Sequence, residues 1–349
     1  MLTEILKIIA PGTPLRAGLD NILKAKTGAL IVIGDTKEVL DITDGGFKIN
    51  EAYTPARLYE LAKMDGAIVL SKDLKTILLA NTQVIPSSKI PTEETGTRHR
   101  TAERTAKQTG ELVISISQRR NIITVFKGDF RYVIEDTSKI VTRANQALQT
   151  VENYKRVFDT KLATLNEYEF NDIVTLDNVI TCLQRAEMVM KVAEEVQKAI
   201  YELGDDGLLV KMQLEELIEN LPEEVLLIIK DYIAPNKRLT PEKVYQTLRS
   251  EINEDLKDQN RIAKLLGYDI FENYEEVAVY PKGYRILNKI PRMPNTIVVN
   301  LVKTFKSFQY ILAADIEKLD EVEGIGEVRA RTIKQALRRM QEQFVFDNF

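Results

Sequence analysis

The chain has 349 residues, of which 44% are hydrophobic and 29% are charged, and its formal net charge is −4. This composition is ordinary for a globular protein of two or three domains with a sizeable core. Cys182 is the only cysteine and His99 the only histidine, which excludes an intrachain disulfide and a Cys/His zinc site. No apolar run is long enough to span a membrane, and Glu4 and Lys7 interrupt the segment where a signal peptide would be apolar. We therefore expect a cytoplasmic protein in a reducing compartment, neither secreted nor embedded in a membrane.

The first 138 residues alternate between short apolar runs and helical patterns. The runs at 28–34 and 67–70 are continuously apolar, as in strands that are buried on both faces of a sheet. Further strands are predicted at 75–85, 112–117, 121–126 and 130–134, and helices at 3–9, 14–26, 54–63 and 101–108. We therefore predict an α/β domain with a mixed central sheet over residues 1–138.

From Ser138 the character of the chain changes, because apolar residues now recur every three or four positions. Two long helices are predicted, from Ser138 to about Leu162 and from Ile173 to Ile200, and the second is ended by the glycines and aspartates at 204–207. Shorter helices are predicted at 208–220, 223–233, 241–256 and 261–266. Residues 139–288 should thus form an all-α linker and assembly domain.

The C-terminal part of the chain is predicted to be helical and basic. Residues 281–349 contain 12 Lys or Arg and 8 Asp or Glu, so their net charge is +4 although the whole chain carries −4. Bound nucleic acid should therefore contact this part of the chain. Helices are predicted at 295–305, 307–313, 316–319 and 328–341, and residues 289–349 are predicted to form an all-α domain.

A lone carboxylate marks the first candidate site. Asp65 lies between a predicted helix and a predicted strand, at a strand edge where α/β folds tend to bind ligands. Gly66 would let a phosphate or a ring approach the backbone closely. An ordinary Asp-Gly turn is the alternative that these two residues leave open.

A cationic triplet marks the second candidate site. Arg98, His99 and Arg100 stand in a Gly/Thr turn just before the predicted helix at 101–108. Because a helix N-terminus is already partly positive, this clustering is unfavourable unless an anion compensates it. A solvated basic loop is the alternative. The chain has no P-loop pattern, so a bound nucleotide must be held in another way.

Together, Asp65-Gly66-Ala67 and Gly96-Thr97-Arg98-His99-Arg100-Thr101, downstream of Gly28-Ala29-Leu30, resemble the motifs of the diadenylate cyclase family. The order of the three regions is similar to that in family members with a C-terminal helix-hairpin-helix domain. The resemblance implies that two ATP molecules condense into cyclic 3′,5′-di-adenosine monophosphate with release of two pyrophosphates. It also implies a homo-oligomer, expected to be an octamer, in which two active sites face each other across a two-fold axis.

The resemblance also implies roles for individual residues. Asp65 would hold Mg²⁺ or Mn²⁺ and help to activate the ribose 3′-hydroxyl, while Arg98, His99 and Arg100 would bind the triphosphate. Gly28 to Leu30 would wall the adenine pocket, although a plain core strand is an equally good interpretation. The further ATP contacts that it implies are Gly66, Val84, Thr97, Thr101 and Ser117, with Arg120 as an additional candidate.

A glycine-containing hairpin occurs near the C-terminus. Residues 322–326, Val-Glu-Gly-Ile-Gly, separate two helical patterns, and such glycines let N–H groups at the next helix start meet phosphate oxygens. A glycine-capped helix end in a structural bundle is the alternative. Residues 290–294, Ile-Pro-Arg-Met-Pro, are similar to the hairpin of a degenerate first copy. The predicted DNA contacts are Gly324, Ile325, Gly326, Arg329, Arg331 and Lys334, with added charge from Arg338 and Arg339.

We therefore predict a diadenylate cyclase with a DNA-binding C-terminal domain. The family resemblance adds affinity for branched DNA such as Holliday junctions, coupled to suppression of the cyclase. One alternative is a DNA-binding protein that senses a nucleotide without turnover. Another is a nucleotidyltransferase that acts on DNA ends.

Overall fold

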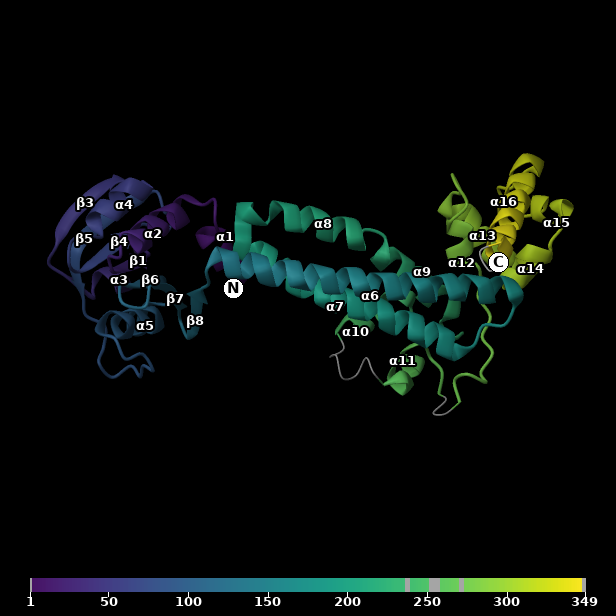
Figure 1. The fold of residues 1–349 in the computed structure, drawn as a ribbon, viewed down its shortest axis with the longest axis horizontal. Coiled ribbons are helices and arrows are strands. Elements are labelled where there is room, and N and C mark those ends of the chain that lie inside the picture. The colour runs from purple at the N-terminus through teal and green to yellow at the C-terminus, as the bar shows by residue number, and fades with distance from the viewer. Residues whose placement is uncertain (1, 236–238, 251–257, 270–272, 347–349) are drawn as a thin grey trace. The chain divides into compact units, whose positions relative to one another are not determined.

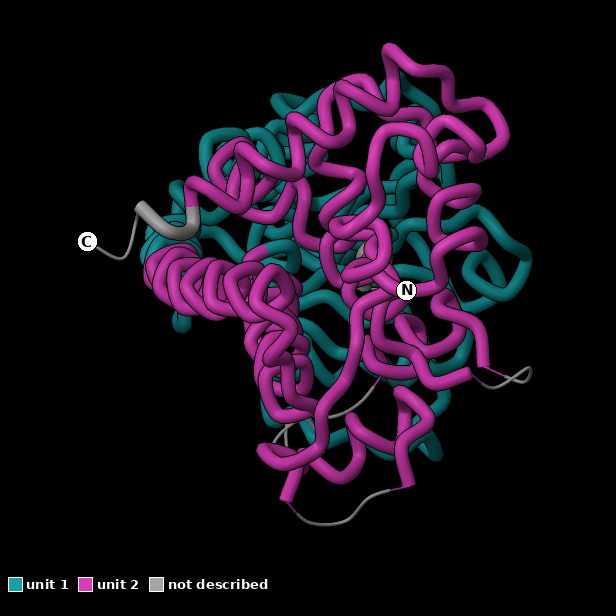
Figure 2. The backbone as a smooth tube through the Cα atoms, turned by 90° about the vertical axis from the view of Figure 1, so that its right-hand side faces the viewer, with its two compact units in different colours: residues 1–145, 197–211 teal, residues 146–196, 212–349 magenta. Residues whose placement is uncertain are grey.

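The computed structural model describes residues 2–235, 239–250, 258–269 and 273–346. Its contacts divide the chain into two compact units, residues 1–145 with 197–211 and residues 146–196 with 212–349 (Figure 2). The domain boundaries expected near 138 and 288 stay predictions. Among the described residues, no helix combines the length and the apolar character that crossing a membrane requires.

An eight-stranded sheet forms the centre of the first unit. The strands β1 and β4 are parallel, and the other strand pairs are antiparallel, so the predicted mixed sheet is confirmed. The strand order is β2 (Thr43–Asp44), β5 (Thr76–Val84), β4 (Ala67–Leu70), β1 (Ala29–Ile33), β6 (Leu112–Ser117), β7 (Ile122–Lys127) and β8 (Phe130–Ile134), with β3 (Phe47–Ala52) paired to β5.

The central strand β1 contributes to two apolar layers. Ala29, Ile31 and Ile33 pack with side chains of α1 (Leu2–Ile9), α2 (Pro14–Lys24) and α4 (Pro55–Leu61). Leu30 and Val32 belong to a second cluster, with side chains of α3 (Lys37–Leu40) and α5 (Thr97–Thr109). Figure 1 accordingly shows α2 and α4 on one side of the strands and α5 on the other. Because helices cover both faces of β1, its residues form the continuous apolar run found in the sequence.

A local difference from the sequence prediction that bears on the candidate site lies at the start of α5. The prediction places this helix from Thr101, with the cationic triplet in a preceding turn. The structure begins the helix at Thr97 with Gly96 as its N-cap, so the triplet forms part of the first turn. These polar residues carry no apolar periodicity that would have marked the helix start.

Helices account for the rest of the described chain, as predicted. α6 and α7 both extend through the division between the two units, and η1 ends α7 at the predicted glycines. Residues 251–256 of one predicted helix lie outside the described residues, and α12 is an addition to the prediction. The helices are α6 (Thr137–Asn171), α7 (Leu176–Leu203), η1 (Gly204–Gly207, 3-10), α8 (Leu208–Ile218), α9 (Leu221–Tyr232), α10 (Pro241–Ser250), α11 (Gln259–Leu265), α12 (Tyr284–Asn288), α13 (Asn295–Phe305), α14 (Phe308–Ala313), α15 (Ile316–Asp320) and α16 (Glu327–Phe346).

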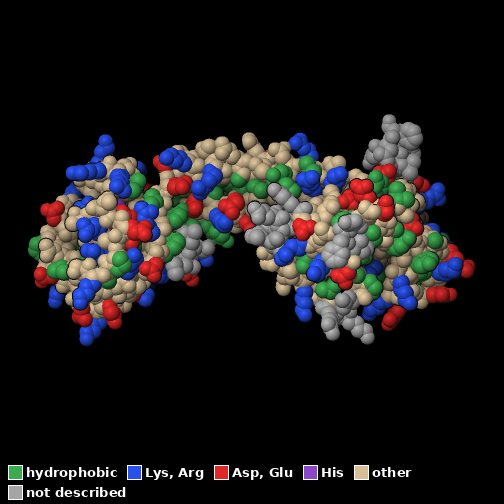
Figure 3. Space-filling model, turned by 90° about the horizontal axis from the view of Figure 1, so that it is seen from below, with side chains coloured by type: hydrophobic (Ala, Val, Ile, Leu, Met, Phe, Trp, Pro, Cys, Tyr) green, Lys and Arg blue, Asp and Glu red, His purple; other side chains and the backbone are tan. Residues whose placement is uncertain are grey.

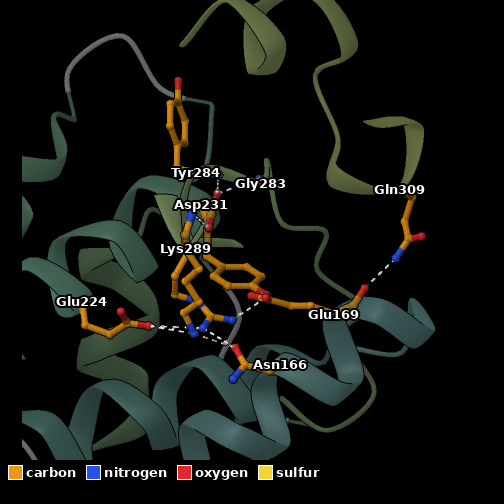
Figure 4. A network of polar contacts seen from close by, with 10 residues as sticks. Asn166, Glu169, Glu224, Asp231, Gly283, Tyr284, Lys289 and Gln309 are labelled. Atoms are coloured by element: carbon orange, nitrogen blue, oxygen red, sulfur yellow. Dashed lines mark hydrogen bonds and ion pairs between the residues drawn. The ribbon is translucent and has the colours of Figure 1, made fainter. Parts of the chain in front are cut away.

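A buried ionic cluster connects α6 and α9 to α12 within the second unit (Figure 4). Arg285 of α12 is fully buried, and its Nη2 pairs with the equally buried carboxylate of Glu169 in α6. Its Nη1 donates to Asn166 Oδ1 at 2.5 Å and to Glu224 Oε1 at 3.2 Å. The cluster gives both terminal nitrogens of this buried guanidinium polar partners, whereas its Nε has none among the described residues.

A second carboxylate of this cluster caps α12. Asp231 of α9 accepts the backbone N–H groups of Gly283, Tyr284 and Arg285 at 2.7–2.9 Å. Burial raises the pKa of Asp231 to about 7, the Glu169 carboxylate acts in the same direction, and the donated hydrogen bonds oppose the shift. The start of α12 is therefore fixed by a residue that lies far away in the sequence.

Candidate functional site

The first turn of α5 lies at the centre of the candidate site. Gly96 caps the helix with φ −82° and ψ 138° and provides no side-chain hydrogen bond to its first N–H groups. Helix-start N–H groups without a capping side chain, together with the positive end of the helix dipole, favour an anion. The local backbone therefore suits a phosphate group.

Two cavities meet at this turn. The larger, about 660 Å³, is lined by residues 94–99 of the loop and helix start and by residues 117–120 after β6. The smaller, about 510 Å³, is lined by Leu30, Gly66, Ala67, residues 82–85, Thr97, Arg98 and Thr101. Thr97 and Arg98 line both cavities, so one side chain can contact groups bound in either.

Two glycines make room at the site. A Cβ atom at Gly28 would lie 2.1 Å from Nη1 of Arg98, so the guanidinium group packs directly on the backbone. Gly66 has a φ of +86°, and a Cβ atom there would lie 2.8 Å from the carbonyl oxygen of Thr82. A side chain at Gly28 would displace Arg98, and one at Gly66 would strain the turn after Asp65.

His99 is buried in the wall of the larger cavity. Its Nδ1 lies 3.2 Å from Oγ of Ser115, and its Nε2 has no hydrogen-bond partner among the described residues. The ring meets Phe126 edge to face at 6.5 Å between centroids. Burial lowers the pKa of His99, the charge of Glu94 opposes this, and Arg120, Arg98 and Arg131 add to it. The ring is therefore neutral near pH 7.

The loop before α5 is held by side chains of α5 itself. Glu103 accepts the hydroxyl hydrogen of Thr92 and the backbone N–H of Glu93. Arg104 donates to the carbonyl of Ile90 at 2.9 Å, and Gln108 accepts the N–H of Ser87 at 2.8 Å. These contacts fix the backbone that leads into the first turn of the helix.

One ion pair also ties the cavity wall to a strand. Arg131 of β8 donates from Nε to Glu94 Oε1 at 2.7 Å, and the Glu94 side chain is only 9% exposed. Glu94 is the acidic residue among those lining the larger cavity. It was not predicted from the sequence, because its role depends on a strand that follows it by more than thirty residues.

Most of the predicted ATP-site residues line these cavities, but Gly28, Ala29, Asp65 and Arg100 do not. Asp65 is exposed next to Gly66, and Arg100 is exposed on α5; neither is among the residues lining the two cavities. Successive helical residues point about 100° apart, so Arg98, His99 and Arg100 cannot all face one cavity. The roles of Asp65 and Arg100 stay predictions. The smaller cavity brings together Gly66, Val84, Thr97, Arg98 and Thr101, and the larger brings together Thr97, Arg98, His99, Ser117 and Arg120.

The side chains that could act as metal ligands restrict which metal ion could bind at the candidate site. Among the described residues, no three His, Cys, Asp or Glu side chains gather as a metal site. Mg²⁺ commonly uses one or two carboxylates and completes its shell with waters and substrate phosphates. A single exposed carboxylate at Asp65 fits such an ion and would not fit a cation that needs a complete protein cage.

The candidate DNA-binding hairpin connects α15 to α16. Gly324 has a φ of +82°, and Gly326 directly precedes α16. In the degenerate copy between α12 and α13, Arg292 takes a φ of +59° at the matching position, and Pro294 is the N-cap of α13. Both hairpins thus share the left-handed residue and the helix start, although only the second has glycines there.

The predicted DNA contacts differ in their surroundings. Arg329 donates to the carbonyl of Gly324 at 2.5 Å, and Arg331 pairs with Glu327 on the exposed face of α16. The ammonium group of Lys334 donates to the carbonyls of Leu312 and Ala314, both at 2.7 Å. Lys334 therefore caps the end of α14, and contact with DNA stays a prediction for all of these residues.

The charge on the visible surface does not by itself locate a nucleic-acid site. On the face in Figure 3, Lys and Arg side chains are interspersed with Asp and Glu. A proposal for DNA binding must therefore rest on the backbone of the hairpin and on particular side chains.

Comparisons with known proteins identify the family. Residues 16–130 match the family model described as DisA bacterial checkpoint controller nucleotide-binding, and residues 134–275 match the DisA checkpoint controller linker region. The DNA integrity scanning protein DisA of Clostridium botulinum is 53% identical over 99% of this chain and 97% of its own. The protein of the same name from Acetivibrio thermocellus is 54% identical over 99% of this chain and 96% of its own.

Among solved structures, DacA from Staphylococcus aureus aligns with 35% of this chain and 85% of its own, at 20% identity and a TM-score of 0.31. The two family models and the near full-length relatives carry the assignment. The chain therefore belongs to the DisA family of bacterial checkpoint controllers and is a diadenylate cyclase.

Proposed function

We propose that this chain joins two ATP molecules into cyclic 3′,5′-di-adenosine monophosphate and releases two pyrophosphates. In each half-reaction the 3′-oxygen of one ATP bonds to the α-phosphorus of the other, and the bond to pyrophosphate breaks. The observation that carries the proposal is the meeting of two cavities at Thr97 and Arg98, on a helix start that favours phosphate.

Phosphoryl transfer depends mainly on alignment and on neutralising charge. Arg98 would hold phosphate oxygens through its planar guanidinium group, and His99 would contact them from the wall of the larger cavity. Arg100 would add positive charge outside the cavities. The remaining ATP contacts would be Gly66, Val84, Thr97, Thr101 and Ser117, with Arg120 at the far side of the larger cavity.

Asp65 would hold Mg²⁺ or Mn²⁺ together with phosphate oxygens of ATP. When bound, such an ion lowers the pKa of a hydroxyl group that it contacts and neutralises phosphate charge. Gly66 lines the smaller cavity and lets this turn pass close to β5, so the neighbouring Asp65 would be near enough to hold an ion bound there.

The symmetry of the product supports an oligomeric enzyme. Cyclic di-adenosine monophosphate has a two-fold axis, so two sites should face each other across a two-fold axis of the assembly. We propose an even-numbered homo-oligomer, an octamer, in the cytoplasm, and domains at 1–138, 139–288 and 289–349. The separated monomer should have no cyclase activity.

The full-length protein, incubated with ATP and Mn²⁺ or Mg²⁺, tests the reaction. Chromatography with mass spectrometry should detect the cyclic dinucleotide and two pyrophosphates per product molecule, and Arg98→Ala should lose most of this activity. Binding of ATP without any product would instead favour the alternative, a nucleotide sensor that binds DNA. Consumption of DNA in the same assay would favour a nucleotidyltransferase that acts on DNA ends.

The C-terminal hairpin is proposed to bind branched DNA such as Holliday junctions. Gly324, Ile325 and Gly326 would place N–H groups of the α16 start near phosphates, and Arg329, Arg331 and Lys334 would supply charge. The affinity for a four-way junction should fall steeply with salt, and the junction should lower the cyclase rate of the full chain. A rate that is unchanged at saturating junction would contradict the proposed coupling.

A further inference from the structure

Ser115 lies next to His99 in the candidate site, and its side chain has one hydrogen-bond partner among the described residues. It is fully buried in β6, opposite Leu30 of β1 and Thr124 of β7. Among the described hydrogen bonds, its hydroxyl takes part in one, with Nδ1 of His99 at 3.2 Å. The other ring nitrogen, Nε2, is buried and has no partner among the described residues. One ring nitrogen is thus held by the sheet, and the other is buried without a partner among the described residues.

The hydrogen bond can be formed in two ways, which differ in their cost. If Nδ1 carried the ring hydrogen, it would donate to Ser115, and the serine hydrogen would be left buried without an acceptor. Nε2 would then carry a lone pair, which would repel any phosphate oxygen that approached it. If Ser115 donates to Nδ1, the hydroxyl hydrogen is satisfied, and Nε2 carries a hydrogen that can be donated to an anion. The second arrangement leaves no buried donor unsatisfied once a phosphate is present.

Burial and the charges around His99 favour its neutral ring. Burial is the largest cause that lowers the pKa of His99, and Arg120 in the turn after β6, Arg98 on α5 and Arg131 on β8 act in the same direction. Glu94 opposes them, but its carboxylate is paired with Arg131. A neutral ring has one hydrogen to place, and its position is therefore decided by the partner of Nδ1.

We infer that Ser115 is a positioning residue that donates to Nδ1 of His99 and thereby holds the neutral ring in the tautomer with hydrogen on Nε2. This inference rests on the proposed function, because it makes His99 a hydrogen-bond donor to phosphate oxygens of ATP. The histidine then stabilises charge on the transferring phosphoryl group. It does not serve as the base for the 3′-hydroxyl, since Nε2 already carries its hydrogen.

The single histidine makes a direct test possible. Full-length protein labelled with ¹⁵N only in histidine gives signals from one imidazole ring, and its two nitrogen shifts distinguish the tautomers and the charged form. Spectra at pH 7.5 with a saturating non-hydrolysable ATP analogue should show hydrogen on Nε2 and none on Nδ1. Hydrogen on Nδ1, or a charged ring, would overturn the inference. This measurement requires no turnover, so it separates the inference from the proposed reaction.

Matched variants test the role of the serine. Ser115→Ala removes the donor and should yield a mixture of tautomers, with kcat lower by about three- to tenfold, the effect of one lost hydrogen bond. Thr124→Val is the control, because Thr124 lies across from Ser115 and its buried Oγ1 has no partner among the described residues. It should leave both the tautomer and kcat unchanged.

The outcomes are distinguishable. The same tautomer and kcat in Ser115→Ala as in the wild type would refute the positioning role. If Ser115→Ala does not fold, the wild-type spectrum alone still decides which nitrogen carries the hydrogen. If the wild type shows the expected tautomer but forms no cyclic product, the proposed reaction fails, while the hydrogen bond from Ser115 stands.

Discussion

The guanidinium group of Arg98 rests on the backbone of Gly28, one residue before β1 begins. The two residues come from different elements, and a Cβ atom at Gly28 would lie 2.1 Å from Nη1 of Arg98. The position of this cation at the junction of the two cavities therefore depends on the absence of a side chain at the residue that leads into β1.

Gly28→Ala should reduce cyclase activity without unfolding the protein. The φ of Gly28 is not in the left-handed region, and the atom that must move is the end of a flexible side chain. We expect kcat/KM to fall by about ten- to a hundredfold. Complete loss of one charge-stabilising donor typically costs about a hundredfold or more, and Gly28→Ala displaces Arg98 without removing it. Thermal unfolding should shift little. Gly28→Ala in an Arg98→Ala background should cost almost nothing further, and additive losses would contradict this coupling.

Asp65→Asn should abolish cyclisation and largely preserve ATP binding. The amide keeps the size of the side chain but is a weaker ligand for a divalent ion. Product formation and ATP affinity can be measured on the same preparation. Asp41→Asn, at another exposed carboxylate of the same unit, should behave as the wild type. Wild-type turnover in Asp65→Asn would contradict the role proposed for this residue.

The pH titration of His99 should report its surroundings. Its pKa lies below the ordinary value of 6.5, and Glu94 opposes that shift. The ¹⁵N titration of the wild type should therefore have a midpoint below pH 6.5, and Glu94→Gln should lower it further. Glu93→Gln, at the adjacent carboxylate, should change it much less. A midpoint that rises in Glu94→Gln would show that Glu94 is not a significant charge at the ring.

The lowered pKa of His99 also makes the stability of the protein depend on pH. Unfolded His99 takes up a proton at a higher pH than the folded residue does, so the unfolded state binds more protons as pH falls through 6.5. The contribution of His99 to stability is therefore complete above that pH and is lost progressively below it. Unfolding of His99→Gln should lack this component when compared with the wild type between pH 7.5 and pH 5.5.

Breaking the buried ion pair in the second unit should be costly. Arg285→Met leaves the carboxylate of Glu169 buried without its cation, which typically costs about 3–5 kcal/mol. Hydrogen exchange at the N–H groups of Gly283 and Tyr284, which Asp231 accepts, would report the local loss. Arg338→Met is the control, because its pair with Glu342 is exposed and should contribute less than about 1 kcal/mol. Equal losses of stability in the two variants would show that burial does not decide what each ion pair contributes.

Substitutions of two basic residues of α16 should distinguish a role in stability from a role in DNA binding. Lys334→Met removes two hydrogen bonds to the end of α14 and should lower the unfolding temperature. Arg331→Met should leave that temperature nearly unchanged, because its side chain is exposed. It should instead reduce the salt dependence of junction binding by about one released counterion. A salt dependence that is unchanged in Arg331→Met would remove this residue from the DNA contact.

The sequence predicted best those parts of the structure that depend on local patterns. β1 and β4 were recognised because burial on both faces yields uninterrupted apolar runs. β3 was missed because it is an edge strand with mostly exposed residues and has no such run. The start of α12 was missed because Asp231, which caps it, belongs to a separate helix.

In the candidate site, recognisable motifs were found and their supporting residues were not. Arg98 and His99 stand together in a distinctive segment, which made them visible. A single serine in an apolar strand carries no such signal, and Ser115 is recognised only once β6 and α5 pack together. The exposure of Arg100 follows from helix geometry, but only after the helix start at Thr97 is known.

The cluster around Arg285 also bears on how the second unit could be exchanged between proteins. Asp231 caps α12, Gln309 donates to the carbonyl of Glu169, and Phe170 packs edge to face on Phe308 at 5.2 Å. A chimaera that joined a foreign tail after residue 288 would lose two of these three contacts. A chimaera in which the second unit stays folded must therefore take the end of α6 and the whole of α9 from the same protein as the two hairpins.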